Sequence, residues 1–567
     1  MSHKRGRKTN NVKYSSSNKD KKNYSKAAVS SAVNAETHET FEDKMEKLLE
    51  YFEKLRPIDY ISGLFVLYMF TFYLIYMDDM YFNITFTRAN VFWKGSLTFI
   101  VIAVLAYLYD LFIEMRDPVK IGLKKMIFIK DTKFYKLPEL WMGLFFLANV
   151  FAYINAENKL TAWTGESGRY FGLKMIFIAA VMFFMLSRSC YVNYINYLLG
   201  LAVSIFAVVM AYVQHFGADP FKLKAMMRED QRELFISLFG NINTYGSFLA
   251  VIIPMAAAMF IFSKKYWIKC ISAAGVFILA IGIIPAKSDN VYLGVVAAML
   301  IMFFVAIYYK RLSYFMVCCD FMLMGLLFMA HRNLAGEGSQ KHINGIAEVI
   351  ESPKIMMMIL IGFLVMTMIV IFVDFKILRK LGKRPTIRIM IILGILIAAL
   401  IAAVCVIGVR MKLSLFVFND QWGTLRGYIW RRGVSLFERA NPMQKLFGYG
   451  NETISQYMTK YYNDEMLEIT KRTYDNLHNE FLQYLVTTGI FGALTYVGLF
   501  ISGISYLIKN SEGDPAVLIF MAGVAGYWVQ GLVYLNQPIT TPLYFVLLAA
   551  GIGYIRFKRR FAEEEQS

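Results

Sequence analysis

The sequence predicts an all-α fold, a polytopic membrane helix bundle of about 14 transmembrane helices with one long helical extracytoplasmic loop. Of the 567 residues, 57% are hydrophobic and 18% are charged, which is more apolar than a soluble globular chain. Apolar runs of about 17 to 25 residues recur along most of the chain, and each is long enough to cross about 30 Å of hydrocarbon as a helix. Strands of a membrane barrel would instead be short segments of alternating hydrophobicity.

The first predicted domain, residues 1–57, is a basic disordered cytoplasmic tail with an amphipathic helix. Its start, MSHKRGRKTNNVKYSSSNKDKKNYSK, is rich in Ser and Asn and almost free of aliphatic residues, so it cannot bury enough apolar surface to fold alone. No apolar core of a signal peptide follows the basic start. Between Phe41 and Phe52 apolar residues recur at helical spacing, which predicts a helix on the membrane surface that ends at Pro57.

The apolar segments predict the spanning helices in chain order. Eleven make up the second domain, residues 58–409, and three belong to the last domain, residues 479–567, which ends in a short basic cytoplasmic tail. The segments are residues 60–78, 93–114, 138–155, 171–187, 191–213, 243–262, 267–285, 290–309, 313–330, 354–374, 387–409, 479–507, 515–534 and 540–556.

Lys and Arg are concentrated in alternate connections between these segments, for example in DFKILRKLGKRPTIR and in the end RFKRRF. Because basic connections favour the cytoplasmic side of a membrane, the pattern predicts a multi-pass protein with cytoplasmic N- and C-termini. Three longer connections, residues 214–242, 331–353 and 410–478, then lie on the opposite side. The net charge of +19 is explained by the tail, these basic loops and anionic membrane lipids, so no nucleic-acid partner is expected.

The third predicted domain is the extracytoplasmic loop of residues 410–478. A connection of this length among short ones is functional or disordered, and its aromatic content favours order. In TLRGYIWRRGVSLFERANP, apolar residues from Leu425 to Phe437 recur at helical intervals, and Asn441-Pro442 follows as a stop. The pattern predicts an amphipathic helix with Arg426 and Trp430 one turn apart on one face.

His478 lies where this loop enters the membrane, in the stretch DNLHNEFLQYL. An imidazole there is partly desolvated but reachable from water, which suits a general base near neutral pH. The alternative interpretation is an interfacial histidine that caps a helix.

Arginines lie on the predicted outer side, against the positive-inside bias. Arg426 and Arg431 belong to the long loop, and Arg228 and Arg232 to residues 214–242. The planar guanidinium binds phosphate oxygens in a bidentate way and keeps its charge, so these residues could hold a phosphorylated lipid. A solvated face, or snorkelling to the membrane surface, explains a single arginine equally well.

Several motifs of the chain resemble those of the O-antigen ligase and polymerase family of bacterial envelope glycosyltransferases, and they occur in the same order. GNINTYGSFL resembles the family's Gly-Asn-x-Asn helix start, and LRGYIWRRGVSLFERANPMQKLFGYG resembles its Arg-x-x-x-Trp, Pro and Gly-x-Gly pattern. LHNEFLQYLVTTGIFGALTY resembles its His-Asn-x-x-Leu-x-x-Leu-x-x-x-Gly-x-x-Gly signature, and the resemblance covers roughly residues 140–557. One departure is Asp289, which follows Ser288 where many members have Arg, so Arg232, Arg228 or Lys287 would have to supply the second phosphate contact.

The resemblance implies a metal-independent inverting glycosyltransferase in the bacterial cytoplasmic (inner) membrane. Such an enzyme transfers a glycan from an undecaprenyl-diphosphate carrier to an acceptor hydroxyl on the outer face, and the acceptor is a glycan, a lipid or a protein. No cofactor is expected, and no outer Asp-x-Asp motif offers a metal site. Ligase, polymerase and protein glycosyltransferase are not separated by these motifs.

The resemblance also implies roles for individual residues. His478 removes the acceptor proton and Arg426 stabilises the diphosphate leaving group. The predicted substrate-binding residues are Arg232, Arg228, Arg431, Trp430, Asn479 and Glu480. Trp430 stacks on a sugar or anchors the loop at the bilayer surface, and Asn479 orients the imidazole or caps a helix.

The rival hypothesis is a transporter, a flippase for polysaccharide or lipid-linked oligosaccharide. Many helices and basic outer loops would serve an anionic lipid equally well. A transporter would be expected to carry ionisable groups or broken helices near the membrane midplane, in two related halves. Few charges lie inside the predicted spans, and no clear repeat is visible.

Overall fold

Helices dominate the computed structural model of the chain, which describes residues 55–116, 137–166, 169–335, 350–413 and 416–566. The chain divides into two units, Met1–Arg56 and Pro57–Ser567, and the helices named below belong to the second. The predicted tail and its amphipathic helix, up to residue 54, lie outside the described residues.

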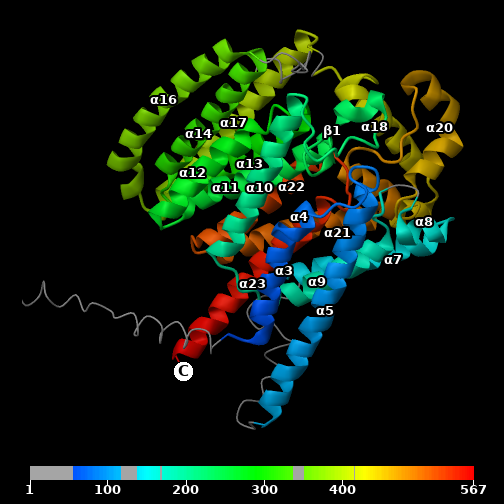
Figure 1. Cartoon of the computed structure of the whole chain (residues 1–567), viewed down its shortest axis with the longest axis horizontal. Helices are drawn as coiled ribbons and strands as arrows, with labels where there is room; N and C mark the ends of the chain where they lie inside the picture. Colours follow the sequence, from blue (N-terminus) through cyan, green and yellow to red (C-terminus); the bar gives the residue numbers. More distant parts are fainter. Residues whose placement is uncertain (1–54, 117–136, 167–168, 336–349, 414–415, 567) are drawn as a thin grey trace, which may run out of the picture. The chain divides into compact units, whose positions relative to one another are not determined.

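Every apolar segment predicted to span the membrane overlaps at least one helix (Figure 1). These helices are α3 (Pro57–Phe70), α4 (Phe72–Ile75), α5 (Ile84–Arg116), α7 (Pro138–Asn155), α9 (Leu173–Leu186), α10 (Tyr194–His215), α11 (Ile242–Phe262), α12 (Tyr266–Ile281), α13 (Asp289–Tyr308), α14 (Leu312–Ala335), α16 (Pro353–Lys376), α17 (Lys383–Arg410), α21 (Glu480–Asn510), α22 (Pro515–Gln530) and α23 (Thr541–Gln566).

The other described elements are short or lie in the connections. They are α8 (Lys159–Thr164), α18 (Trp422–Arg439), α19 (Pro442–Phe447), α20 (Ile454–Thr470), the 3₁₀ turns η3 (Glu229–Leu234) and η4 (Leu378–Lys380), and strands β1 (Phe235–Ile236) and β2 (Gly240–Asn241). The two strands pair antiparallel, with Phe235 opposite Asn241.

Nine helices in the described ranges are long and apolar enough to cross a membrane, and α9, α12 and α22 are shorter apolar helices. The prediction of an all-α polytopic membrane protein is thereby confirmed. The nine long helices account for part of the predicted 14 crossings, because three further segments form shorter apolar helices and the segments at α7 and α23 do not meet the same length and hydropathy criteria.

Helix α11 forms the centre of the bundle, where it packs against α12, α13 and α22 (Figure 1). It is apolar on every side, which is the pattern of a helix surrounded by other helices. The backbones of α11 and α22 approach closely at Gly526, because this residue has no Cβ that would collide with the carbonyl of Ala250. In contrast, only Thr386 and Gly408 of α17 are buried, and its apolar side chains face outward.

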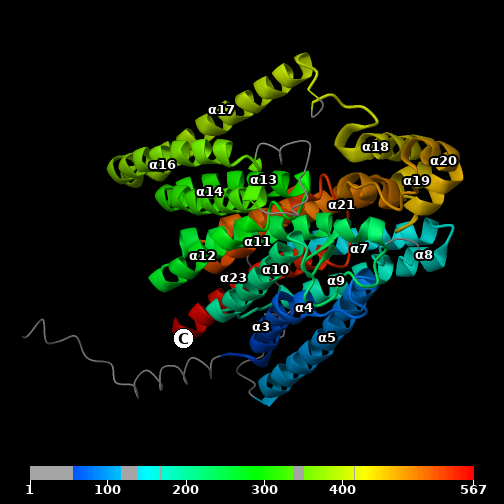
Figure 2. The same cartoon turned by 45° about the horizontal axis from the view of Figure 1, so that its top comes forward.

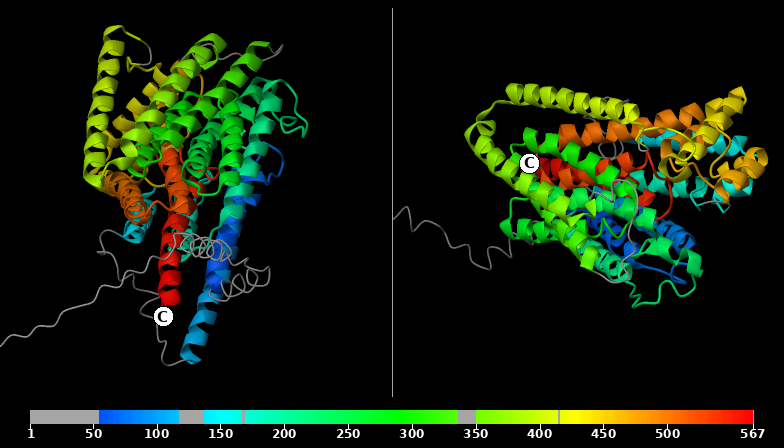
Figure 3. Two further views of the ribbon diagram at one scale, coloured as in Figure 1. Left: turned by 90° about the vertical axis from the view of Figure 1, so that its left-hand side faces the viewer. Right: turned by 90° about the horizontal axis from the view of Figure 1, so that it is seen from above.

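Charged residues are paired at the end of the bundle where α23 finishes. Arg556 binds Glu139, and Lys558 lies 2.6 Å from Asp514. Figure 3 shows this end of α23 on the same side as the C-terminal end of α5. These pairs neutralise carboxylates that would otherwise be costly near an apolar medium.

The described part of the long connection after α17 is mostly helical and has its own apolar core. Buried residues of this second core include Tyr428, Leu436, Met458 and Met466. Helices α18, α19 and α20 gather at one end of α21, and α19 also contacts α7 (Figure 2). The predicted amphipathic helix is α18, and α19 and α20 are additional helices that the sequence pattern had not indicated.

Asn441-Pro442 separates α18 from α19 as the sequence predicts, and it also starts the second helix. The side chain of Asn441 accepts a hydrogen bond from the backbone N–H of Gln444, and Pro442 occupies the first turn. The chain therefore turns sharply here, which brings α19 onto α21.

Candidate functional site

Four segments meet where the chain enters α21. They are the connection between α8 and α9, the start of α18, residues 471–479, and the connection between α22 and α23. The charges of Arg169, Arg426 and Asp475 act on the His478 ring, which places these four side chains in one cluster. The backbone N–H of Glu480 donates to the carbonyl of Gly531 at 2.9 Å and ties α21 to the fourth segment.

The backbone of His478 adopts a left-handed conformation, with φ of 47°. Its N–H donates to Oδ1 of Asn476 at 3.0 Å, and its ring meets the edge of Tyr474 at a centroid separation of 6.3 Å. The imidazole Nδ1 is buried and has no hydrogen-bond partner among the described residues. A buried, unpaired ring nitrogen in a partly exposed residue is an acceptor that a bound hydroxyl could use.

Burial, together with the positive charges of Arg426 and Arg169, lowers the pKa of His478 to about 3, and Asp475 acts in the opposite direction. The imidazole is therefore neutral at pH 7, the form that accepts a proton. A pKa this low also makes the imidazole a weak base in the free protein.

Arg426 is held by a tight turn at the start of α18. Gly423, Thr424 and Leu425 all have positive φ, and Nη1 of Arg426 donates to the Gly423 carbonyl at 2.9 Å. The next residue, Gly427, packs against the carbonyl of Asn419, where a Cβ would collide. The turn fixes where the guanidinium leaves the backbone, and α18 becomes regular only after it.

Arg169, which sequence reasoning missed, forms a two-contact ion pair with Asp475. Its Nε lies 3.0 Å from Oδ2, and its Nη2 donates to Oδ1 at 3.2 Å. Its backbone N–H donates to Oε2 of Glu452 at 3.0 Å. The available sequence signal was one arginine in GESGRYFG, between two apolar segments on the predicted outer side.

Glu452 is the buried carboxyl of the GYGNE turn. Burial raises its pKa to about 7, although the hydrogen bond from the Arg169 backbone opposes this shift. A carboxyl in this range changes charge near neutrality, directly behind the Arg169 connection.

The Gly-Asn-x-Asn motif lies at the start of α11. Asn241 caps the helix, because its side chain accepts from the N–H of Asn243 at 2.8 Å. Asn243 in turn accepts from the Ser288 hydroxyl at 2.6 Å. Thr244 and Tyr534 share a hydrogen bond of 2.6 Å, and the charges of Arg169 and Arg426 act on Tyr534. The motif is thereby connected to the His478 cluster.

The contacts of Arg228 and Arg232 remain within their own loop. Arg228 forms a bidentate pair with Asp230 at 3.1 and 2.9 Å, and Nε of Arg232 donates to the Met227 carbonyl at 3.2 Å. Both side chains are exposed. Arg431 is exposed as well and pairs with Asp420. These three arginines are exposed, and none of their described contacts involves His478.

Trp430 lies in an aromatic cluster with Trp422 and Phe418. The centroid of the Trp430 ring lies 5.2 Å from that of Trp422 and 6.3 Å from that of Phe418. Within the described ranges, its buried indole N–H has no hydrogen-bond partner. Trp430 and Arg426 leave α18 one turn apart, as the spacing predicted.

Asn479 and Glu480 support the start of α21. Asn479 caps the helix, because its side chain accepts from the N–H of Leu482 at 3.0 Å. Glu480 is buried, and Oε1 accepts from the Tyr527 hydroxyl at 3.2 Å. Both side chains therefore engage the helix and the bundle, and neither has a described contact with the His478 ring.

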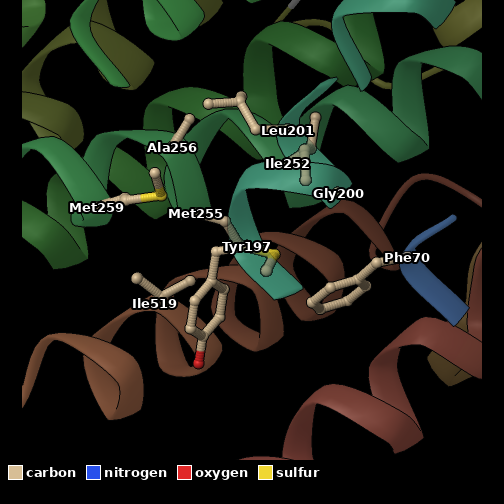
Figure 4. A pocket seen from close by; sticks show the side chains of 9 residues that line it. All are labelled: Phe70, Tyr197, Gly200, Leu201, Ile252, Met255, Ala256, Met259 and Ile519. Atoms are coloured by element: carbon tan, nitrogen blue, oxygen red, sulfur yellow. The ribbon is translucent and has the colours of Figure 1, made fainter. Parts of the chain in front are cut away.

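An apolar pocket lies elsewhere, between α3, α10, α11 and α22 (Figure 4). Its lining includes Phe70, Leu201 and Met255, and the Tyr197 hydroxyl donates to the Ala516 carbonyl at 3.4 Å. It contains no residue of the His478 cluster, and its lining offers packing rather than chemistry.

The fold and the cluster define a class: a multi-pass helical membrane protein with a histidine and arginine site at one end of its bundle. Residues 357–497 match the family described as O-antigen ligase (Wzy_C), which confirms the resemblance inferred from the motifs. The matched residues run from α16 into α21 and include Arg426, Trp430 and His478. This part of the chain is therefore similar to O-antigen ligase- or polymerase-type membrane enzymes of polysaccharide biosynthesis. No curated protein matches the chain.

Proposed function

We propose that the protein transfers a glycan from an undecaprenyl-diphosphate carrier to an acceptor hydroxyl on the outer face of the bacterial cytoplasmic membrane. One observation carries the proposal. Within the matched domain, a neutral imidazole with an unpaired Nδ1 lies beside Arg426, at the point where the chain enters a membrane helix.

The reaction is a single displacement at the anomeric carbon. The acceptor oxygen forms a bond to this carbon while the bond from the carbon to the diphosphate oxygen breaks. The electron pair of the broken bond leaves with the carrier diphosphate, and the acceptor proton passes to His478. Attack from the side opposite the leaving group inverts the anomeric configuration.

Arg426 has the chemistry to stabilise the leaving group, because its planar fork matches two phosphate oxygens and keeps its charge. Burial is the main cause of the low pKa of His478, and the positive charge of Arg426, which a bound diphosphate would offset, lowers this pKa further. His478 would then become a stronger base only when the donor is bound. This coupling would raise the pKa of His478 in the direction that a general base needs.

The other candidate residues have subsidiary roles in this proposal. Arg228, Arg232 and Arg431 are exposed and would meet the parts of the substrates that approach from water. Trp430 offers a ring on which a sugar could stack. Asn479 and Glu480 fix the start of α21 and hence the backbone that leads from His478.

We further propose that the 14 predicted segments all cross the membrane, with both termini in the cytoplasm and residues 410–478 outside. The nine long helices and the shorter α9, α12 and α22 support this arrangement. The charged pairs at the end of α23 lie where a basic cytoplasmic end is expected.

The test is glycan transfer by the purified protein in detergent from a radiolabelled undecaprenyl-diphosphate donor, with and without EDTA. Wild type should release carrier diphosphate whether or not the chelator is present. His478→Ala should lower the rate by about 10² to 10⁴ without changing membrane insertion.

His331→Ala is the matched control, because His331 is an exposed histidine on α14 and should be dispensable. Near-normal transfer by His478→Ala would remove His478 from the role of base. If the protein transfers glycan from no donor but flips lipid in liposomes, the results would favour the transporter hypothesis. Loss of activity in EDTA would reject the metal-independent reaction.

A further inference from the structure

His478 is held in a conformation that costs free energy for any residue except glycine. Its φ of 47° is in the left-handed region, where a side chain with a Cβ is disfavoured. Such a conformation persists only when neighbouring contacts enforce it. The hydrogen bond from the His478 N–H to Oδ1 of Asn476 is one of these contacts.

Asn476 is itself held by the preceding residue. Its Nδ2 donates to Oδ1 of Asp475, so the amide group bridges Asp475 and the His478 backbone. Asp475 is anchored from outside this loop by Arg169, at 3.0 and 3.2 Å. A continuous chain of polar contacts therefore runs from Arg169 through Asp475 and Asn476 to His478.

We propose that Arg169 is a positioning residue: through Asp475 and Asn476 it fixes the backbone that presents the His478 ring to the acceptor. This role rests on the proposed function of His478. Two nitrogens of the Arg169 fork are engaged by Asp475, so its geometry fits an anchor better than a diphosphate ligand.

The pair is poorly suited to a mainly stabilising role for the whole protein. The side chains of Arg169 and Asp475 are 32% and 31% exposed, and ion pairs with this much solvent contact contribute little to the free energy of unfolding. Its effect is local, because it joins the α8–α9 connection to the loop that ends at His478. A displacement of about 1 Å at a reacting group is enough to lower a rate by about 10².

The first measurement is carbethoxylation of His478 by diethyl pyrocarbonate at pH 7.5 in the full-length protein, followed by peptide mass spectrometry. It needs no donor, and exposed His331 in the same sample is the reference. Arg169→Ala and Asp475→Ala should each raise the modification of His478 relative to His331 by about tenfold. Because the ring stays neutral at this pH, the change reports access rather than protonation.

The second measurement is steady-state transfer by the same proteins. Each single variant should lower kcat by about 10² and leave KM for the donor within about twofold. The double variant should be no worse than either single one, because both remove the same contact. Arg169→Lys should recover part of kcat, and it replaces Arg169→Ala if that variant fails to fold.

Lys460→Ala is the matched control, because it removes an exposed ion pair with Glu157 at 3.6 Å and should change neither readout. Unchanged modification and kcat in the Arg169 variants would reject the positioning role. A raised donor KM with normal kcat would instead make Arg169 a diphosphate ligand, and additive losses in the double variant would show separate roles. If the wild type transfers no glycan but the modification of His478 changes in the Arg169 variants, the positioning role is retained and the proposed function is rejected.

Discussion

At the scale of the residue, the candidate site contains a histidine whose pKa is set by burial and by the charges of its neighbours. Short motifs indicated His478 and Arg426 as candidate residues, and their roles stay predictions. The sequence did not predict Arg169, whose partner Asp475 is 306 positions away in the chain. It also could not predict the low pKa of His478, which arises from burial and from charges on separate segments.

Arg426→Lys should lower the rate of transfer by about tenfold or more, because an ammonium group cannot reproduce a planar two-contact fork. The measurement is kcat/KM for the donor. Arg439→Lys is the matched control, because Arg439 is exposed at the end of the same helix. If lysine at 426 supports full activity, the diphosphate is recognised elsewhere.

The pKa values of His478 and Glu452 predict opposite effects of pH on stability. The pKa of His478 is about 3 in the folded protein, below its ordinary value of 6.5, so stability from this group is lost as pH falls from about 6.5 toward 3. The pKa of Glu452 is about 7, above its ordinary value of 4.5, so stability is lost as pH rises from about 4.5 through 7.

The thermal midpoints of two variants, each measured at pH 5 and at pH 8, test the two groups separately. The midpoint of His478→Asn minus that of wild type should be larger at pH 5 than at pH 8, because the substitution removes a group that resists protonation in the fold. Glu452→Gln should show the reverse, because it removes a group that resists ionisation. Parallel shifts in both variants at both pH values would contradict these assignments.

At the scale of the element, the length of the apolar segments predicted where helices occur, but it gave little information about the structure of residues 410–478. Each long apolar segment overlaps a helix because the need to satisfy backbone hydrogen bonds in lipid is a local constraint. Helix α20 and the left-handed turn at Gly423–Leu425 depend on contacts between α18, α20 and α21. Such contacts have no counterpart in a periodic pattern, so neither feature could be read from the sequence.

Gly489→Ala should destabilise the protein by about 1 to 3 kcal/mol. Gly489 lies within α21 but has φ of 70° and ψ of −173°, a combination of backbone angles that is open only to glycine. A Cβ there would also collide with the backbone of Leu446 in α19. The check is the thermal midpoint, with Gly362→Ala as the control, since that position has open space around it. An unchanged midpoint for Gly489→Ala would contradict the close packing of α19 on α21.

At the scale of the whole molecule, the two ends of the bundle have different characters. One end holds the paired charges of α23, and the other holds the His478 cluster and the helices of the long loop. The family match runs from α16 into α21, so it includes Arg426, Asp475 and His478 of this cluster and leaves Arg169 outside. Which end faces the cytoplasm stays a prediction from the distribution of Lys and Arg.

The central claim is a direct displacement at the sugar, with His478 as the base. The measurement that tests it most directly is the anomeric configuration of the new glycosidic bond, determined by NMR on product made by the purified protein from a donor of known configuration. We predict that the configuration is inverted relative to the donor. Retention would require an even number of displacements, and it would contradict the single step assigned to His478 and Arg426.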